Sequence, residues 1–286
     1  MKVLVTGAAG MLGRDVVQGA PAGVQVIATD AAELDITDSV SVRRAVDDQR
    51  PDWIINCAAY TAVDRAESEP QIAERVNHSA VRILASACEA TGTRLCHVST
   101  DYVFPGDATH AYLEDDPVGP VNRYGATKLA GEQAALAAGA LIVRTQWLFG
   151  AHGRSFPRTM WERARSGQPT RVVDDQVGRP TYTVDLALAT WSLLERDATG
   201  VFHATNAGRP VSWYTLAAHI FAAAGASVAL SPCRTEDYPT PARRPAYSAL
   251  DTTKLAVAGL HLPPWEGAVD RFLDEVRAAS ESGSGA

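Results

Sequence analysis

Short apolar runs alternate with longer amphipathic segments over the first half of the chain. The apolar runs, rich in Val, Ile and Leu, lie at residues 2–7, 24–30, 53–59, 94–100 and 140–145. Helical spacing of apolar residues occupies 12–20, 39–50, 71–92 and 124–139 between them. Strands that are apolar on both faces and alternate with helices indicate a parallel sheet covered on its two sides. We therefore predict a doubly wound α/β fold of the Rossmann type.

The pattern loosens after residue 150. Prolines divide the later segment, and helical stretches such as WYTLAAHIFAAAG at 213–225 stand between loops. We predict a Rossmann domain over 1–150 and a smaller α/β region over 151–286, with segments of the two interleaved. The last residues, SESGSGA at 280–286, are small and polar, which is typical of a flexible tail.

Charge and cysteine content narrow the class of protein. The net charge of −7 argues against general binding to nucleic acid or to acidic membranes. The four cysteines include no CxxC pair, so we expect unpaired thiols in a reducing cytoplasm. No apolar segment is long enough for a bilayer, and the chain opens on a strand instead of a signal peptide.

A glycine-rich turn joins the first expected strand to the first expected helix. It reads TGAAGMLG, with Gly7, Gly10 and Gly13 spaced as GxxGxxG. Glycines there permit a tight turn and bring backbone N–H groups to a pyrophosphate at the helix N-terminus. We therefore predict a dinucleotide site, which includes Met11 and Leu12 of the same turn. The alternative is a glycine-rich turn without a ligand.

Asp30 ends the second strand, where a carboxylate can accept hydrogen bonds from the adenosine ribose hydroxyls. That position favours NADH, because a 2′-phosphate would be repelled. Asp30 also suits a simple turn or cap. Asp35 and Ile36 follow and are expected beside the adenine, although Asp38 and Ser39 could equally cap the next helix.

The third strand ends in NCAAYTAVDRAESEP, in which the small residues Ala58 and Ala59 let a cofactor lie near the backbone. We include the neighbouring Tyr60 in this predicted cofactor site. Ordinary loop chemistry explains the segment equally well. Asn77 lies inside a predicted helix, where an amide is an unusual choice, so it either braces the site or is a polar surface residue.

Tyr124 and Lys128 stand four residues apart and share one face of a helix. A nearby ammonium favours the phenolate and is expected to lower the tyrosine pKa, which makes the phenol a general acid near neutral pH. The same lysine is placed to bind the nicotinamide ribose. Thr100, at the carboxyl end of the fourth strand, can hydrogen-bond a substrate carbonyl. A YxxxK pattern alone arises often by chance, but its combination with the glycine turn and the ST dipeptide is specific.

These motifs identify a resemblance that covers nearly the whole chain. The sequence resembles the extended short-chain dehydrogenase/reductases, and among them the dTDP-4-dehydrorhamnose reductase family. The matching segments are TGAAGMLG, NCAAYTAVDRAESEP, STDYVFPG, YGATKLAGE, RTQWLFG, DDQVGRPT and YPTPARRPAYSALDT. The last three are the most specific, because generic Rossmann enzymes lack them.

The resemblance implies roles for particular residues. Tyr124 would be the proton donor with Lys128 as its partner, and Thr100 and Asp101 would contact the substrate. Trp147 would pack against the sugar. Arg243 and Arg244, in ARRP, would help to hold the nucleotide diphosphate, although paired surface arginines are commonly only solvated. Residues 1–150 would then bind NAD(P) and 151–286 would mainly bind substrate.

The resemblance also implies a cofactor and raises the question of a metal. The family uses NADPH or NADH, whereas Asp30 argues for NADH. Some relatives bind Mg²⁺ at a subunit contact, and Asp15 and Asp185 fall near such positions, but the sequence offers no full ligand set. We expect no metal ligands. Met11 and Arg65 depart from the residues common in the family. A homodimer is implied by the family alone.

The implied reaction is reduction of the C4 ketone of dTDP-4-dehydrorhamnose (dTDP-4-dehydro-6-deoxy-L-mannose) to dTDP-L-rhamnose by NAD(P)H. One alternative is the reduction of another dTDP-4-keto-deoxysugar, because stereochemistry depends on loop geometry. A second is a non-catalytic regulatory subunit that keeps the fold and binds a dinucleotide. The joint presence of Thr100, Tyr124 and Lys128 favours an enzyme, because a scaffold has no need of a tuned tyrosine.

Overall fold

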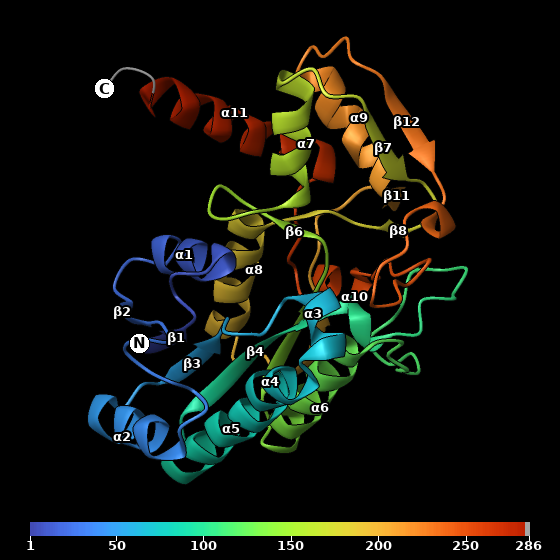
Figure 1. Ribbon diagram of the computed structural model, residues 1–286. Helices are drawn as coiled ribbons and strands as arrows, with labels where there is room; N and C mark the ends of the chain where they lie inside the picture. Colours follow the sequence, from blue (N-terminus) through green and yellow to red (C-terminus); the bar gives the residue numbers. More distant parts are fainter. Residues whose placement is uncertain (284–286) are drawn as a thin grey trace.

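A computed structural model describes residues 1–283 and shows a six-stranded parallel sheet (Figure 1). Its strands are β1 (Lys2–Thr6), β2 (Gln25–Thr29), β3 (Trp53–Asn56), β4 (Arg94–Thr100), β5 (Leu141–Thr145) and β10 (Gly200–His203). The strand order is β10-β5-β4-β3-β1-β2, and each neighbouring pair is parallel. The winding direction reverses between β1 and β3, which places a ligand crevice at the carboxyl ends of these strands. The predicted fold class is confirmed.

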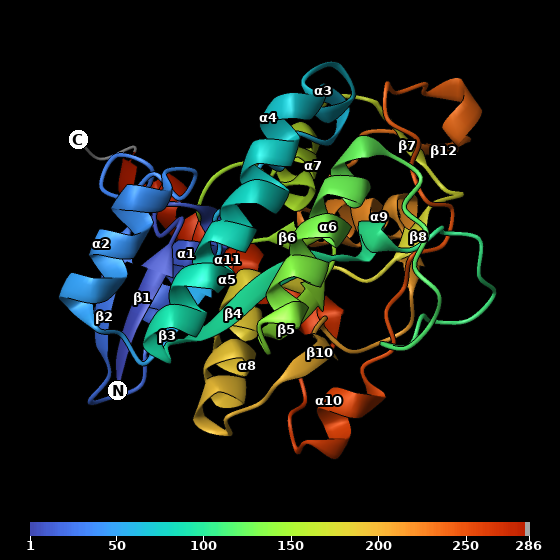
Figure 2. The same ribbon diagram turned by 90° about the horizontal axis from the view of Figure 1, so that it is seen from below.

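Helices cover both faces of this sheet. They are α1 (Met11–Gln18) and α8 (Thr183–Glu195) on one face, and α2 (Ser39–Gln49), α5 (Ala80–Thr91) and α6 (Arg123–Ala137) on the other. Figure 2 shows α2, α5 and α6 crossing in front of the strands. Because side chains alternate along a strand, Val3 and Val5 pack with α1 and α8 while Leu4 packs with α5. The indole of Trp191 on α8 also donates to the main-chain oxygen of Val16 on α1 at 2.8 Å.

The segment predicted as one helix over 71–92 is divided. It consists of α4 (Pro70–Glu74), a π-helical turn η1 (Arg75–Ser79) and α5, after a short α3 (Val63–Ser68). A π-turn widens the helix by one residue and commonly marks a functional position. Helix α6 crosses closely here: a Cβ on Gly131 would lie 1.9 Å from the main-chain oxygen of Asn77. Glycine is therefore required at 131, and Asn77 is buried at this crossing.

A second region lies beyond the carboxyl edge of the sheet (Figure 1). Its helices are α7 (Phe156–Arg165), α9 (Trp213–Ala223) and α11 (Trp265–Gly283). Its strand pairs are β6 (Leu148–Phe149) with β9 (Thr181–Tyr182), β7 (Thr170–Val173) with β12 (Leu230–Cys233), and β8 (Val177–Gly178) with β11 (Val211–Ser212). The three helices share one apolar cluster that includes Trp161, Phe221 and Phe272. There are also two short 3-10 turns, η2 (Asp101–Val103) directly after β4 and η3 (Thr235–Asp237) after β12.

The two regions are interleaved in sequence. Helix α8, strand β10 and the short α10 (Thr253–Val257) come after residue 150, yet they pack on the sheet of the first region. Helix α11 continues through 280–283, where the sequence analysis places the start of a flexible tail. Within this last part of the helix, the Ser280 hydroxyl donates to the main-chain oxygen of Val276, one turn earlier, at 2.8 Å. Residues 284–286 of the expected tail lie outside the described residues.

Two further expectations concern cysteines and membranes. All four cysteines are free thiols; Cys88, Cys96 and Cys233 are buried, and Cys57 is half-buried at the end of β3. Within residues 1–283, none of the helices combines the length and the apolar character needed to cross a membrane.

Candidate active site

Two adjoining hollows lie at the carboxyl ends of the strands, and both are lined by Gly10, Cys57 and Ala59. The first, with a volume of about 460 Å³, runs along the glycine turn to the ends of β4 and β5. The second, of about 400 Å³, lies beside the end of β2. We call them the central hollow and the adenosine-side hollow. Together they place nearly all of the predicted site residues around one crevice.

The glycine turn fits a bound pyrophosphate. Helix α1 begins after Gly10, with no side-chain cap and no acidic residue in its first turn, so its free N–H groups are available to an anion. A Cβ on Gly13 would lie 2.1 Å from the main-chain oxygen of Gly7, so only glycine allows this close turn. The predicted residues of this turn all line one or both hollows, namely Gly7, Gly10, Met11, Leu12 and Gly13.

The adenosine-side hollow is lined by Asp30, Asp35, Ile36, Ala58 and Ala59, as predicted for cofactor contacts. Asp38 provides the cap of α2, because its carboxylate accepts from the main-chain N–H of Val40 at 3.1 Å. The Asp35 carboxylate accepts from the main chain and the hydroxyl of Thr37, which lowers its pKa. Capping therefore belongs to Asp38, and Asp30 and Asp35 face the hollow.

Tyr124, Lys128 and Thr100 meet in the central hollow. Helix α6 presents the first two from successive turns and is capped by Asn122, whose Oδ1 accepts from the main-chain N–H of Gly125 at 2.8 Å. The phenol ring of Tyr124 packs edge-on against Tyr102, with ring centroids 5.4 Å apart. The three side chains on which the sequence analysis bases catalysis thus converge beside the glycine turn.

The pKa of Tyr124 is raised to about 12, whereas the sequence analysis expects a lowering by Lys128. Burial is the largest cause, a hydrogen bond with Thr100 opposes it, and the nearby Asp101 carboxylate adds to it. The Lys128 Nζ is directed to the main-chain oxygen of Val98, to which it donates at 2.6 Å. That expectation is therefore wrong for the protein groups alone, and the phenol is firmly protonated at neutral pH.

Lys128 and Asp101 titrate closer to neutrality than usual. Burial lowers the pKa of Lys128 to about 8, against the opposing effects of Glu132 and Cys57. Burial raises the pKa of Asp101 to about 7, although hydrogen bonds with Ser248 and Thr100 lower it. The Thr100 hydroxyl donates to Asp101 Oδ1 at 3.0 Å and accepts from the main-chain N–H of Tyr102 at 3.2 Å. Perturbed groups of this kind are concentrated at functional sites.

Asn77 braces the crevice, so its interpretation as a polar surface residue is wrong. Its side chain is buried. The amide oxygen accepts from the main-chain N–H of Tyr60 at 2.8 Å, and the amide nitrogen donates to the main-chain oxygen of Tyr60 at 3.0 Å. A third bond at 3.2 Å reaches the hydroxyl of Thr127 on α6. Asn77 thereby joins the loop after β3 to the helix that carries Tyr124.

Three of the residues predicted to contact a ligand line neither hollow, namely Tyr60, Arg243 and Arg244. The Tyr60 hydroxyl turns outward and donates to Glu69 at 2.6 Å. Arg244 forms an ion pair of 2.8 Å with Asp64 of α3, and Arg243 is exposed. Trp147 does line the central hollow, with a left-handed φ of 48° and its ring stacked on Trp213 at 3.5 Å.

The acidic residues considered for a metal have other partners. Both Asp185 oxygens accept from the guanidinium of Arg271, at 2.9 and 2.6 Å. Burial raises the pKa of Asp15, and His152 lies 3.9 Å from its carboxylate. Within residues 1–283, no three His, Cys, Asp or Glu residues gather closely enough to hold a metal ion.

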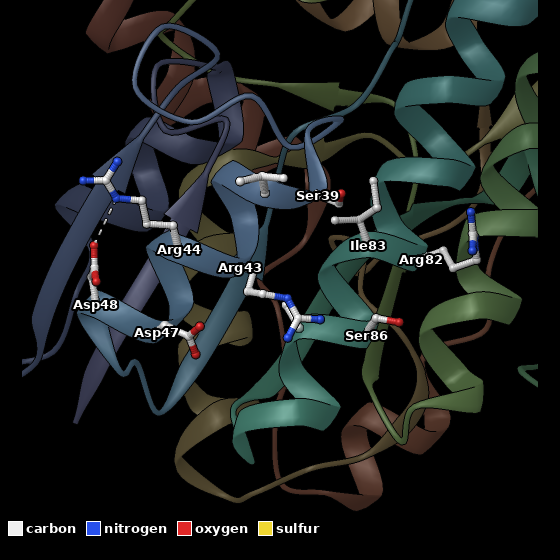
Figure 3. A pocket seen from close by; sticks show the side chains of 10 residues that line it. Ser39, Arg43, Arg44, Asp47, Asp48, Arg82, Ile83 and Ser86 are labelled. Atoms are coloured by element: carbon white, nitrogen blue, oxygen red, sulfur yellow. Dashed lines mark ion pairs between the residues drawn. The ribbon is translucent and has the colours of Figure 1, made fainter.

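A larger hollow of about 700 Å³ lies between α2 and α5 (Figure 3). Its exposed arginines Arg43, Arg44 and Arg82 stand among Asp47 and Asp48, and Arg44 pairs with Asp48 at 3.5 Å. No tyrosine, lysine or histidine lines this hollow, and its two carboxylates are exposed. The chemistry therefore points to the smaller crevice at the carboxyl ends of the strands.

Sequence reasoning missed a row of buried polar residues behind this crevice. Asn56 and His97 lie inside apolar strand runs, and their side chains connect Thr6 of β1 to Lys128 of α6. The only signal in the sequence was the presence of an amide and an imidazole in otherwise apolar strands.

Comparison with known proteins agrees with this geometry. A family profile described as "RmlD substrate binding domain" matches residues 1–278. A dTDP-4-dehydrorhamnose reductase of Streptomyces griseus is 45% identical, covering 93% of this chain and 91% of that protein. A dTDP-4-keto-6-deoxy-D-glucose reductase of Streptomyces niveus is 44% identical, with 90% and 91% covered. A crystal structure of a Bacillus anthracis dTDP-4-dehydrorhamnose reductase in complex with NADP is 38% identical, with a TM-score of 0.92 and 96% and 99% covered.

Proposed function

The chain belongs to the dTDP-4-dehydrorhamnose reductase family, and we propose that it reduces the C4 ketone of dTDP-4-dehydrorhamnose to dTDP-L-rhamnose with NAD(P)H. The observation that carries the proposal is the meeting of Thr100, Tyr124 and Lys128 in the central hollow, directly beside the glycine turn. A proton donor, a hydroxyl that can orient a carbonyl and a lysine beside them suit the reduction of a ketone.

The residues that would hold the cofactor extend from the glycine turn to Asp30 and Asp35. When bound, the nicotinamide supplies the hydride for C4. The Thr100 hydroxyl orients the substrate carbonyl, and Tyr124 gives its phenolic proton to the oxygen of that carbonyl. The high pKa of Tyr124 keeps the proton in place until the substrate oxygen becomes strongly basic. Lys128 would hold the nicotinamide ribose, and in its ammonium form it would compensate the phenolate that remains.

Support for the cofactor comes from two sources that point in different directions. The Bacillus anthracis relative was crystallised with NADP. In this chain the Asp30 carboxylate lines the adenosine-side hollow, where it would repel a 2′-phosphate and accept from the hydroxyls of NADH. We propose that NADH is accepted along with NADPH, at a ratio that Asp30 sets.

The proposal is tested by incubating the protein with dTDP-4-dehydrorhamnose and either NADH or NADPH, and identifying the sugar of the product by NMR. We expect dTDP-L-rhamnose with at least one cofactor, and product formation by the Tyr124→Phe variant that is slower by roughly 10²–10⁴. Absence of turnover with both cofactors, from a protein that binds them, would overturn the proposed activity.

The Streptomyces niveus relative supports a second candidate, the reduction of dTDP-4-keto-6-deoxy-D-glucose. The same assay with this sugar in direct competition decides between the two, because the preferred substrate is consumed first. A regulatory role without catalysis would give binding of cofactor and no turnover of either sugar. A cytoplasmic location and a homodimer stay predictions, which fractionation and light scattering can test.

A further inference from the structure

A line of buried polar side chains crosses the sheet behind the crevice. The Thr6 hydroxyl donates to Asn56 Oδ1 at 2.7 Å, Asn56 Nδ2 lies 3.0 Å from His97 Nδ1, and His97 Nε2 lies 3.3 Å from Lys128 Nζ. These four side chains are each 2% exposed or less. The line runs from β1 through β3 and β4 to the helix that carries Tyr124.

A backbone amide determines the direction of the hydrogen bonds in this line. Asn56 Oδ1 also accepts from the main-chain N–H of Ala58 at 3.2 Å, and a backbone N–H can only donate. A flipped Asn56 amide would place its NH₂ against that donor. The oxygen therefore faces Thr6 and Ala58, and Asn56 Nδ2 must donate to His97 Nδ1.

The same reasoning determines the tautomer of His97. Because Nδ1 accepts a hydrogen bond, it carries no proton, and complete burial holds the His97 pKa well below its usual value. The single ring proton of the neutral imidazole is then on Nε2. That N–H faces Lys128 Nζ, which already donates to the main-chain oxygen of Val98 at 2.6 Å.

A donor that faces an ammonium group is unfavourable, whereas a neutral amine can accept from it. We propose that His97 is a positioning residue for Lys128: its Nε2–H, oriented by Asn56, favours the neutral amine of Lys128 over the ammonium. Lys128 would then change its charge near the working pH of the enzyme instead of remaining permanently cationic. This inference rests on the proposed function only for its catalytic consequence.

The other groups around Lys128 do not cancel this effect. Glu132, one turn further along α6, favours the ammonium, but its carboxylate is already paired with the buried guanidinium of Arg144. Cys57, directly after β3, also raises the pKa of Lys128, but more weakly than Glu132 does. Tyr124, which is also titratable, stands one turn earlier on α6. Burial together with these groups leaves the pKa of Lys128 at about 8, and the donor from β4 acts in the same direction as burial.

The chain offers a direct measurement, because it contains only three lysines, Lys2, Lys128 and Lys254. Labelling with ¹³Cε-lysine gives three resonances, and Lys128→Met identifies the one to follow through a pH titration of the free protein.

Two variants remove the His97 Nε2–H donor beside Lys128 in different ways. In His97→Asn, the shorter amide keeps an acceptor for Asn56 but no longer places an N–H beside Lys128. In His97→Gln, the longer side chain can place an amide oxygen, an acceptor, beside Lys128.

We expect the titration midpoint of Lys128 to rise by about one pH unit in both variants, the effect of replacing one hydrogen-bonding group beside a charge. The matched control is His219→Asn, a half-buried histidine of α9 whose partner is Asp270, and it should leave the midpoint unchanged. Unchanged midpoints in folded His97 variants would overturn the proposal.

A second measurement needs no variant. The ¹⁵N chemical shifts of the His97 ring in the wild-type protein should show Nε2 protonated and Nδ1 unprotonated throughout the pH range of stability. The opposite tautomer would equally overturn the proposal. Neither readout involves the sugar substrate, so a failure of the proposed reductase activity would appear separately, as absence of turnover with normal titrations.

Discussion

The amide of Asn122 joins two segments that are 121 residues apart: its Nδ2 donates to the main-chain oxygen of Arg243 at 2.8 Å. The other end of the same amide caps α6 through the N–H of Gly125. The helix that presents Tyr124 is thus fastened to the ARRP segment proposed to hold the nucleotide diphosphate.

Two substitutions at Asn122 separate its two roles. Serine can still cap a helix but has no group that reaches Arg243, whereas alanine does neither, and losing a cap costs about 1 kcal/mol. We expect Asn122→Ala to unfold at a lower denaturant concentration than Asn122→Ser, and both to raise the KM for the sugar nucleotide alike. A normal KM in Asn122→Ser would show that the contact with Arg243 has no functional role.

Tyr124→Phe should abolish most turnover and spare cofactor binding. The phenyl ring retains the edge-on packing against Tyr102 and loses only the proton donor, a contribution of roughly 10²–10⁴ in rate. We would compare kcat with the fluorescence-measured Kd for NAD(P)H. Tyr214→Phe, on α9 outside the crevice, is the matched control and should retain both. A kcat near the wild-type value would remove Tyr124 from the mechanism.

Asp30→Ala should weaken the use of NADH more than that of NADPH. A charge-assisted hydrogen bond contributes about 1.5–3 kcal/mol, which corresponds to roughly one to two decades in the ratio of kcat/KM values. Asp48→Ala removes an exposed carboxylate of α2 that pairs with Arg44, and it controls for the change in net charge. An equal ratio in wild type and Asp30→Ala would make Asp30 only a turn residue.

Substitution of Arg243 or Arg244 by alanine should weaken the binding of dTDP by about one to two decades and leave NAD(P)H affinity nearly unchanged. Calorimetry measures both dissociation constants. Arg171→Ala is the control, because this exposed arginine has a similar ion pair with Asp237 at 3.2 Å.

The ion pair between Arg244 and Asp64 adds a second arm to this test. Asp64→Asn keeps an acceptor for the main-chain N–H of Ala242 but releases the charge of Arg244, so it should strengthen dTDP binding. If neither arginine substitution affects dTDP, the diphosphate is held elsewhere. If NAD(P)H binding falls equally, the variants have lost structure.

Asp101→Asn should stabilise the protein increasingly as the pH rises. The pKa of Asp101 is about 7 in the folded chain and about 3.8 without the fold, so the folded state holds an extra proton between these values. Stability is therefore full at low pH and is lost as the pH rises toward 7, whereas asparagine stays neutral. The Tm difference between variant and wild type should grow from about pH 4 to about pH 7 and then level off. Asp48→Asn should show no such trend.

Local sequence alone determined a large part of the fold and of the candidate site. The alternation of apolar strands with helices predicted the parallel sheet, because burial on both faces requires it. The glycine turn and the Tyr124–Lys128 pair were predicted because both depend on neighbours within one turn of the chain. Thr100 followed from its position at the end of a strand.

Only the tertiary structure decided contacts that reach beyond one turn or one strand. It brought Asn77 to the backbone of Tyr60, turned the Tyr60 hydroxyl to Glu69, and paired Arg244 with Asp64. It also reversed the expected pKa shift of Tyr124, because burial and the direction of Lys128 depend on how α6 packs on β4. A side chain's charge state is set by its surroundings in three dimensions, and those surroundings are not encoded within a single turn or strand.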